Sequence, residues 1–86
     1  MPIISTFFGI VIRMYYRDHT PPHFHAEYGD RQATFRFDGT RLSGDLRSRT
    51  ALRLIRKWAD LHRQELERNW ARAMAGRSLD RIDPLE

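Results

Sequence analysis

The spacing of apolar residues changes once along this chain, from every second residue to every third or fourth, and this change restricts the fold more than any other feature. In the first half, Ile10, Ile12 and Met14 alternate with more polar neighbours. A period of two indicates strands that face a core on one side and water on the other. This pattern predicts that residues 3–43 form a sheet.

Turn residues divide this half into short strands. The first strand runs over residues 10–17, and the prolines at Pro21 and Pro22 end it because they cannot donate to a strand ladder. Gly29-Asp30 and Asp38-Gly39 are typical hairpin turns. We expect the further strands near residues 23–28, 32–37 and 40–42.

The second half has the period of a helix. Apolar or weakly polar residues recur at three- and four-residue steps on one face, and charged residues fill the other. This face consists of Leu52, Ile55, Ala59, His62, Leu66 and Trp70. One helix over residues 47–75 would be about 40 Å long, more than four short strands cover, so we expect it to kink or to project toward a partner.

These patterns predict an α+β fold with one domain over residues 1–86. A three- to four-stranded antiparallel meander over residues 3–43 packs against one long helix over residues 47–75. Gly76 ends the helix. The tail over residues 77–86 is expected to be irregular and docked on the domain.

Composition excludes several classes of protein. The chain has no cysteine, which excludes a disulfide scaffold, a thiolate zinc site and a cysteine nucleophile. Its longest apolar run, residues 7–12, is far shorter than the roughly 20 residues that span a bilayer, and it lacks the flanks of a signal peptide. We therefore expect a cytoplasmic protein with no membrane partner.

Charge points to an anionic partner. The net charge is +4, and every basic residue except Lys57 is an arginine. The guanidinium group suits phosphate and carboxylate better than a lysine ammonium does. The alternative is a genome that prefers arginine codons, and the sequence leaves both interpretations open.

Two segments together resemble a known family. The string DHTPPHFHAEY over residues 18–28 and the later WADLHRQEL over residues 58–66, followed by Asn69 and Trp70, resemble the bacterial family called domain of unknown function 4160. Its members are often encoded beside a second small family, domain of unknown function 2442, and such pairs resemble toxin–antitoxin modules. The resemblance implies a toxin-like protein with a cognate small antitoxin-like partner, and RNA as a target.

The segment after the double proline contains the residues best suited to catalysis. On a strand, His23 and His25 point to the same side, about 6.5–7 Å apart, and Glu27 continues that row. A metal-independent ribonuclease needs an acid–base pair that titrates near neutrality and a cation on the phosphate. In this hypothesis His23 and His25 are the pair, with Glu27 beside them and Arg13 or Arg36 on the phosphate.

A metal site is an alternative for the same segment. His19, His23 and His25 are ligand types suited to zinc, nickel or ferrous iron, although their spacing matches no strong zinc motif. Apart from this divalent metal, no cofactor is expected. In a third interpretation the histidines are structural: His19 and His23 brace the proline corner, His25 and Glu27 are solvated, and the domain binds an acidic partner without catalysis.

Basic residues also gather where the long helix should begin. These residues are Arg47, Arg49, Arg53 and Arg56. Cations there oppose the helix dipole, so they either form an anion site with free backbone amides or make a solvated basic face. The sequence leaves self-association open as well.

The predicted helix also contains three residues whose roles the pattern leaves open. His62 lies on the apolar stripe and so on the opposite side of the sheet from His23 and His25. Either a bulge changes the strand alternation, or His62 is bonded to a local partner. Trp70 is expected in the core, and Asn69 is expected either to cap a loop or to contact a partner.

Overall fold

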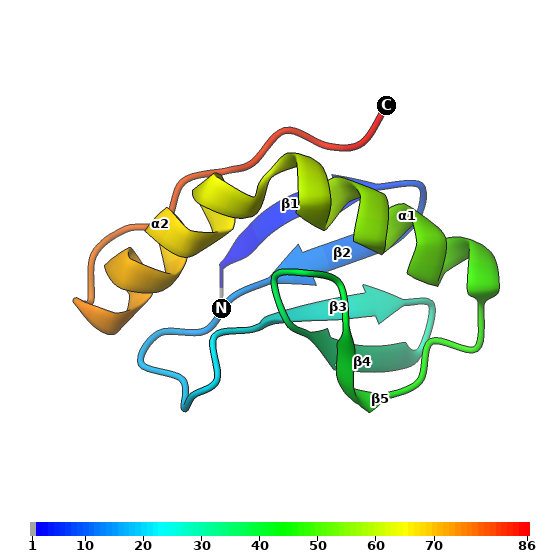
Figure 1. Ribbon diagram of the computed structural model, residues 1–86, viewed down its shortest axis with the longest axis horizontal. Helices are drawn as coiled ribbons and strands as arrows, with labels where there is room; N and C mark the ends of the chain where they lie inside the picture. The colour runs from blue at the N-terminus through cyan, green and yellow to red at the C-terminus, as the bar shows by residue number, and fades with distance from the viewer. Residues whose placement is uncertain (1) are drawn as a thin grey trace.

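A computed structural model describes residues 2–86, in which five strands form one antiparallel sheet (Figure 1). The strands pair in the order in which they follow along the chain, so the sheet is a meander. They are β1 (Ile3–Phe7), β2 (Ile10–Arg13), β3 (Phe24–Tyr28), β4 (Arg31–Phe35) and β5 (Arg41–Gly44). The antiparallel meander is thus as predicted, but the number of strands is five and not three or four.

The strand that the prediction lacks is β1. Its register against β2 shifts between Ile3 and Ser5, and the irregularity leaves Ile4 and Ser5 both buried. A bulge of this kind breaks the strict alternation of apolar and polar residues by which a strand is identified in a sequence. For this reason residues 3–7 lack the period-two pattern that marks β2.

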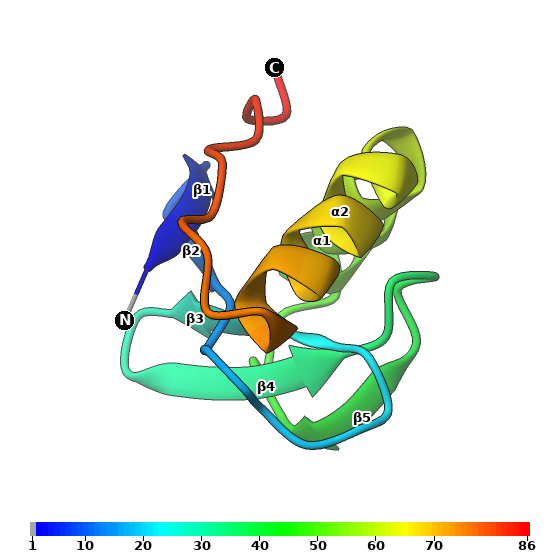
Figure 2. The same ribbon diagram turned by 90° about the vertical axis from the view of Figure 1, so that its left-hand side faces the viewer.

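Two helices cover one face of the sheet (Figure 2). They are α1 (Arg49–Leu61) and α2 (Arg63–Met74), so the prediction of one long helix over residues 47–75 is wrong. The break is at His62, whose φ of −118° and ψ of 27° leave the helical region. Its backbone N–H still bonds to the carbonyls of Trp58 and Ala59, which closes α1. The helix also begins later than predicted, because the Ser48 side chain accepts from the Ala51 N–H as an N-cap.

The change of direction lets both helices bury an apolar face on a short sheet. α1 contributes Trp58, whose ring meets Phe24 of β3 edge to face at 5.6 Å. α2 contributes Leu66 and Ala73, both fully buried.

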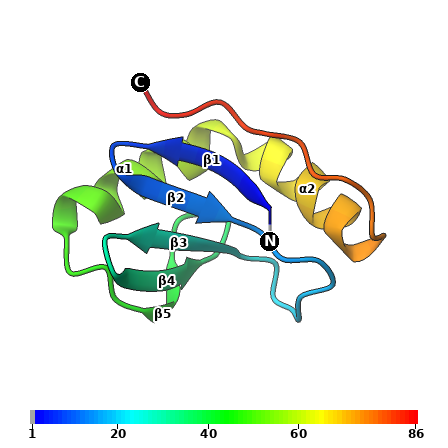
Figure 3. The same cartoon turned by 180° about the vertical axis from the view of Figure 1, so that it is seen from behind.

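The tail over residues 77–86 has no regular structure and returns along β1 (Figure 3). The Ile82 N–H donates to the Ile4 carbonyl at 2.7 Å, and the Trp58 indole donates to the Asp83 carbonyl at 2.9 Å. Ile82 and Leu85 are buried. The tail therefore covers one edge of the sheet and leaves the β5 edge and the face opposite the helices open to solvent.

Neither helix of the described residues 2–86 has the length and hydropathy needed to cross a membrane.

Candidate metal centre

The connection between β2 and β3 carries a carboxylate back onto the two histidines that follow it. Asp18 lies in this loop, His23 precedes β3, and His25 is the second residue of β3. Asp18 Oδ2 is 3.0 Å from His23 Nε2 and 3.0 Å from His25 Nε2. Two imidazole nitrogens at the start of β3 thus meet one carboxylate oxygen from the preceding loop.

A backbone carbonyl fixes the orientation of His23. Its Nδ1 lies 2.7 Å from the Pro21 carbonyl oxygen, which can only accept, so Nδ1 carries the hydrogen. In neutral His23 the lone pair is then on Nε2, the nitrogen that faces Asp18. A histidine that binds a metal usually donates its other ring N–H to a carbonyl or carboxylate in this way.

Aromatic rings enclose the pair of histidines. His23 is only 4% exposed, and its ring centroid lies 5.5 Å from that of Trp70 on α2. The edge of Tyr15 meets His25 at 4.3 Å. These rings limit rotation of the two imidazoles and hold the donor atoms in place.

The pKa of Asp18 is lowered from its ordinary value of 3.8. Burial alone raises the pKa, but the hydrogen bond from His25, the His19 backbone N–H and the nearby charges of His23 and His25 together lower it. The carboxyl is therefore ionised at neutral pH, as a metal ligand must be.

The three side chains have the composition and spacing of a metal centre. One ligand atom from each of Asp18, His23 and His25 lies within 4.8 Å of the others. Two imidazole nitrogens and one carboxylate oxygen suit zinc, and the same set suits ferrous iron with open positions. The donor atoms stand near the separation that metal–ligand bonds of about 2.0–2.2 Å require.

His19, predicted as a third metal ligand, lies at the edge of this group. Its side chain is 87% exposed, and its Nδ1 is 3.0 Å from the other Asp18 oxygen, Oδ1. The structure thus places Asp18 between His19 and the two buried ligand atoms. Asp18 belongs to the same stretch of ionisable residues but was not predicted as a ligand, since four residues, two of them prolines, lie between it and His23.

The residues predicted as catalytic divide into two places. Arg13 is directly opposite His25 on β2, and its Nε bonds to Glu27 Oε2 at 2.9 Å. These residues share the open face of the sheet with His25. Arg36 lies elsewhere, in a pocket that it lines with Trp70 and Arg63.

His62 lies apart from this group and has a local partner. Its Nδ1 is 2.6 Å from Glu65 Oε1, three residues along the chain. This agrees with a histidine bonded locally. Trp70 is half-buried against His23 and Phe37, while Asn69 is buried and bonds to Asp80 in the tail.

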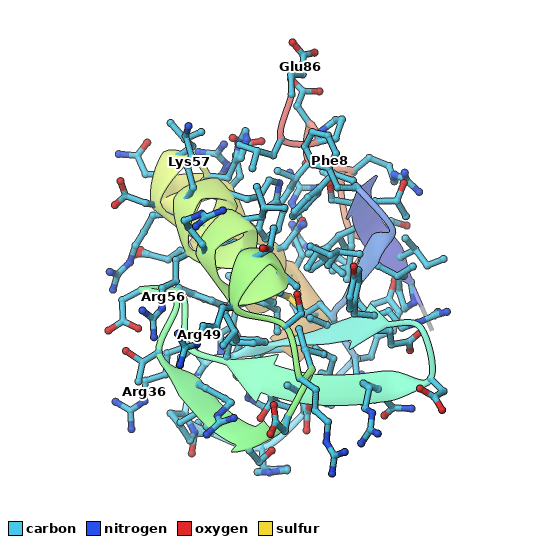
Figure 4. All side chains as sticks on the ribbon, turned by 90° about the vertical axis from the view of Figure 1, so that its right-hand side faces the viewer. Phe8, Arg36, Arg49, Arg56, Lys57 and Glu86 are labelled. Carbon is cyan, nitrogen blue, oxygen red and sulfur yellow. The ribbon has the colours of Figure 1, made fainter. Side chains whose placement is uncertain are left out.

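The arginines predicted to bind an anion lie on the exposed side of α1 and before it. Figure 4 shows Arg49 and Arg56 pointing outward on the same side of the molecule as Arg36. Arg47 and Arg53 are exposed as well. The Arg56 Nε donates to the Gly39 carbonyl at 3.4 Å, so its side chain also packs on the hairpin before β5.

Comparison with known proteins places the chain in a family. The model of a domain of unknown function, DUF4160, matches residues 9–71, well over half of the chain. The chain therefore belongs to this family. No curated protein and no solved structure gives a significant match.

Proposed function

We propose that this member of the DUF4160 family is a small metalloprotein that binds one divalent transition metal through Asp18, His23 and His25. The observation that carries the proposal is the approach of His23 Nε2 and His25 Nε2 to the same Asp18 oxygen, each at 3.0 Å. The hydrogen bond from His23 Nδ1 to the Pro21 carbonyl supports it, because this bond directs the other ring nitrogen toward the proposed metal.

Metal titration of the metal-free protein tests this function. Calorimetry with zinc, nickel or ferrous iron is expected to give one site per chain. In His25→Ala and Asp18→Asn the affinity should fall by about a hundredfold or more, since even the loss of a hydrogen bond to a ligand costs about 10- to 100-fold. His62→Ala is the matched control, because His62 bonds to Glu65 and not to the site.

Circular dichroism of each variant separates loss of binding from loss of fold. His25 is half-buried on the open face, so its replacement should leave the spectrum unchanged. If folded His25→Ala and Asp18→Asn bind zinc as tightly as the original chain, or if no metal binds to the original chain, the proposal is wrong.

A second candidate function is the one that the family resemblance implies. We propose it as a toxin that acts on RNA through His25 and Arg13 and that a small antitoxin-like protein neutralises. The favouring observation is that Arg13 lies opposite His25 on the adjacent strand, where a guanidinium could meet a phosphate beside the imidazole. The exposed arginines Arg49 and Arg53 would bind the acidic partner.

The metal function ranks first because of His23. A general acid or base must reach its substrate, whereas His23 is 4% exposed and uses Nδ1 for a backbone carbonyl. Growth on expression of the chain alone tests the second candidate. Arrest that His25→Ala relieves at equal protein level supports a toxin, and normal growth with the original chain contradicts it.

A further inference from the structure

A pocket opens beside the proposed metal centre, on the face of the sheet that the helices leave free. Its volume is about 440 Å³. His19, His23 and His25 line it together with Pro21, Thr34, Leu42 and Ser43. Two of the three proposed metal ligands thus also form a wall of this pocket.

The metal would be incompletely coordinated by protein. Among the described residues, the group that could hold an ion contains Asp18, His23 and His25 and no fourth side chain. Tetrahedral zinc would keep one position for water or another molecule, and an octahedral metal would keep three. Since His23 and His25 line the pocket, a ligand seated there could reach such a position.

Apolar and hydroxyl groups line the rest of the pocket. Leu42 is a large apolar side chain that is 37% exposed, and Pro21 also lines the pocket. The Thr34 and Ser43 hydroxyls are 2.7 Å apart, and Thr34 lies directly opposite His25. Because one hydrogen is shared between these two hydroxyls, the second remains to be donated to a bound oxygen.

Charge favours a monoanion in this position. A divalent metal with the Asp18 carboxylate carries a net charge of +1, and neither arginine nor lysine lines the pocket. The His19 imidazole does line it, and its Nδ1 lies 3.0 Å from Asp18 Oδ1. A carboxylate neutralises this charge, whereas a doubly charged phosphate would leave an excess negative charge without a guanidinium to meet it. The short apolar surface of Leu42 and Pro21 suits a small hydrocarbon chain.

We infer that this pocket binds a small organic acid whose carboxylate ligates the metal and whose apolar chain packs on Leu42. This inference rests on the proposed metal site and adds the class of its ligand. The Thr34–Ser43 hydroxyl pair donates to the carboxylate oxygen that is not on the metal.

Titration of the cobalt(II)-loaded protein with acetate, butyrate and hexanoate tests the inference. The visible absorption of cobalt should change on binding, because the carboxylate enters the coordination sphere. The affinity should rise about fourfold for each methylene group that packs on Leu42. Phosphate should bind more weakly than butyrate.

A matched pair of variants locates the ligand. Leu42→Ala should weaken butyrate binding by about tenfold and leave cobalt affinity unchanged, because Leu42 is not a metal ligand and alanine adds no donor atom. Leu61→Ala is the control, since Leu61 is 63% exposed at the end of α1 and does not line the pocket. Its butyrate affinity should equal that of the original chain.

The outcomes distinguish this inference from the proposed function. If cobalt binds but its spectrum ignores carboxylates, if the three acids bind equally, or if phosphate binds best, the inference is overturned and the metal site stands. Equal butyrate affinity in Leu42→Ala and Leu61→Ala overturns it as well. If cobalt does not bind at all, both fail together.

Discussion

Asp18 uses its two carboxylate oxygens for different neighbours. Oδ2 faces the nitrogens of His23 and His25, while Oδ1 accepts from the His19 backbone N–H at 2.9 Å. The Asp18 side chain thus both orders the loop and supplies the third of the proposed metal-ligand atoms. The same contacts lower the pKa of the Asp18 carboxyl, so ionisation of this residue is linked to folding.

This linkage predicts how stability of the metal-free protein depends on pH. A carboxyl whose pKa is lower in the folded state stabilises the fold above its unfolded value of 3.8 and loses that contribution as pH falls through the folded pKa. Urea unfolding of the original chain should therefore show a steeper fall in the free energy of unfolding below about pH 4 than Asp18→Asn shows.

Asp30→Asn serves as the control for that experiment. The Asp30 side chain is 97% exposed at a hairpin turn. Its replacement should leave the steep fall in place. Identical slopes in the original chain and in Asp18→Asn would contradict the linkage.

The sequence predicted part of this site, for a physical reason. The histidines at residues 23 and 25 are close in the chain, so any local structure keeps them close. Their spacing predicts that both lie on one face of a strand, but β3 begins at Phe24, and His23 precedes it. His23 is therefore free to turn toward Trp70, while His25 stays on the open face. The position of Asp18 depends on the path of the loop, which residue spacing does not define.

At the scale of elements, the positions of the hairpin turns were predicted more accurately than the bounds of the helices and strands. The hairpins at Gly29 and Gly39 are where the turn residues place them, since both glycines have a positive φ. The break at His62 and the strand β1 depend on which surfaces pack together, and neither leaves a local pattern. β5 ends at Gly44, whose φ is +77°, and its register against β4 is irregular between Thr34 and Phe35.

Gly44→Ala should destabilise the fold strongly. A Cβ at this residue would overlap the Gln32 carbonyl oxygen, which belongs to the backbone and cannot move easily. The overlap and the positive φ together should lower the free energy of unfolding by about 3 kcal/mol, measured by urea denaturation.

Gly29→Ala is the matched comparison for that change. Gly29 also has a positive φ, but a Cβ there meets nothing within 4 Å. Backbone strain alone should lower the free energy of unfolding by about 1 kcal/mol. Equal losses in the two variants would show that the close approach of β4 and β5 is not as described.

Asn69 connects α2 to the tail. Its side chain is 1% exposed, donates to the Asp80 carbonyl at 2.8 Å and accepts from the Asp80 N–H at 2.9 Å. Both backbone groups of Asp80 thus find their partner in one amide. The family match ends at residue 71, so the tail that this contact holds lies outside the matched region.

Asn69→Ala should release the tail while α2 remains folded. The change removes both partners of the Asp80 backbone, at a cost of about 1–3 kcal/mol. Hydrogen exchange should become faster over residues 77–86, including the Ile82 N–H that bonds to β1. Arg68→Ala, an exposed change one residue away, should leave this exchange slow, and slow exchange in Asn69→Ala would contradict the contact.

On the scale of the whole molecule, the two faces and the β1 edge of the sheet have different surroundings. The helices bury one face, the tail covers the β1 edge, and the open face carries Arg13, His25 and Thr34. The proposed metal centre lies at one end of this arrangement, where the β2–β3 loop meets Trp70 of α2. A metal there would connect the loop, β3 and the helix layer through His23.

Metal binding should therefore stabilise the entire fold. A ligand that binds only the folded chain adds about 2.7 kcal/mol at a hundredfold excess over its dissociation constant. For a domain of this size the melting temperature should rise by roughly 10 °C or more with zinc, measured by calorimetry. His25→Ala should show no rise, and His62→Ala should show the full rise. Equal rises in the two variants would contradict a site at His25.

The position of the metal itself tests the central claim most directly. In a crystal of the zinc-loaded protein, anomalous scattering at the zinc edge should give one strong peak about 2.0–2.2 Å from Asp18 Oδ2, His23 Nε2 and His25 Nε2. A peak at His62 and Glu65 instead, or no peak among these three side chains at full zinc occupancy in solution, would contradict it.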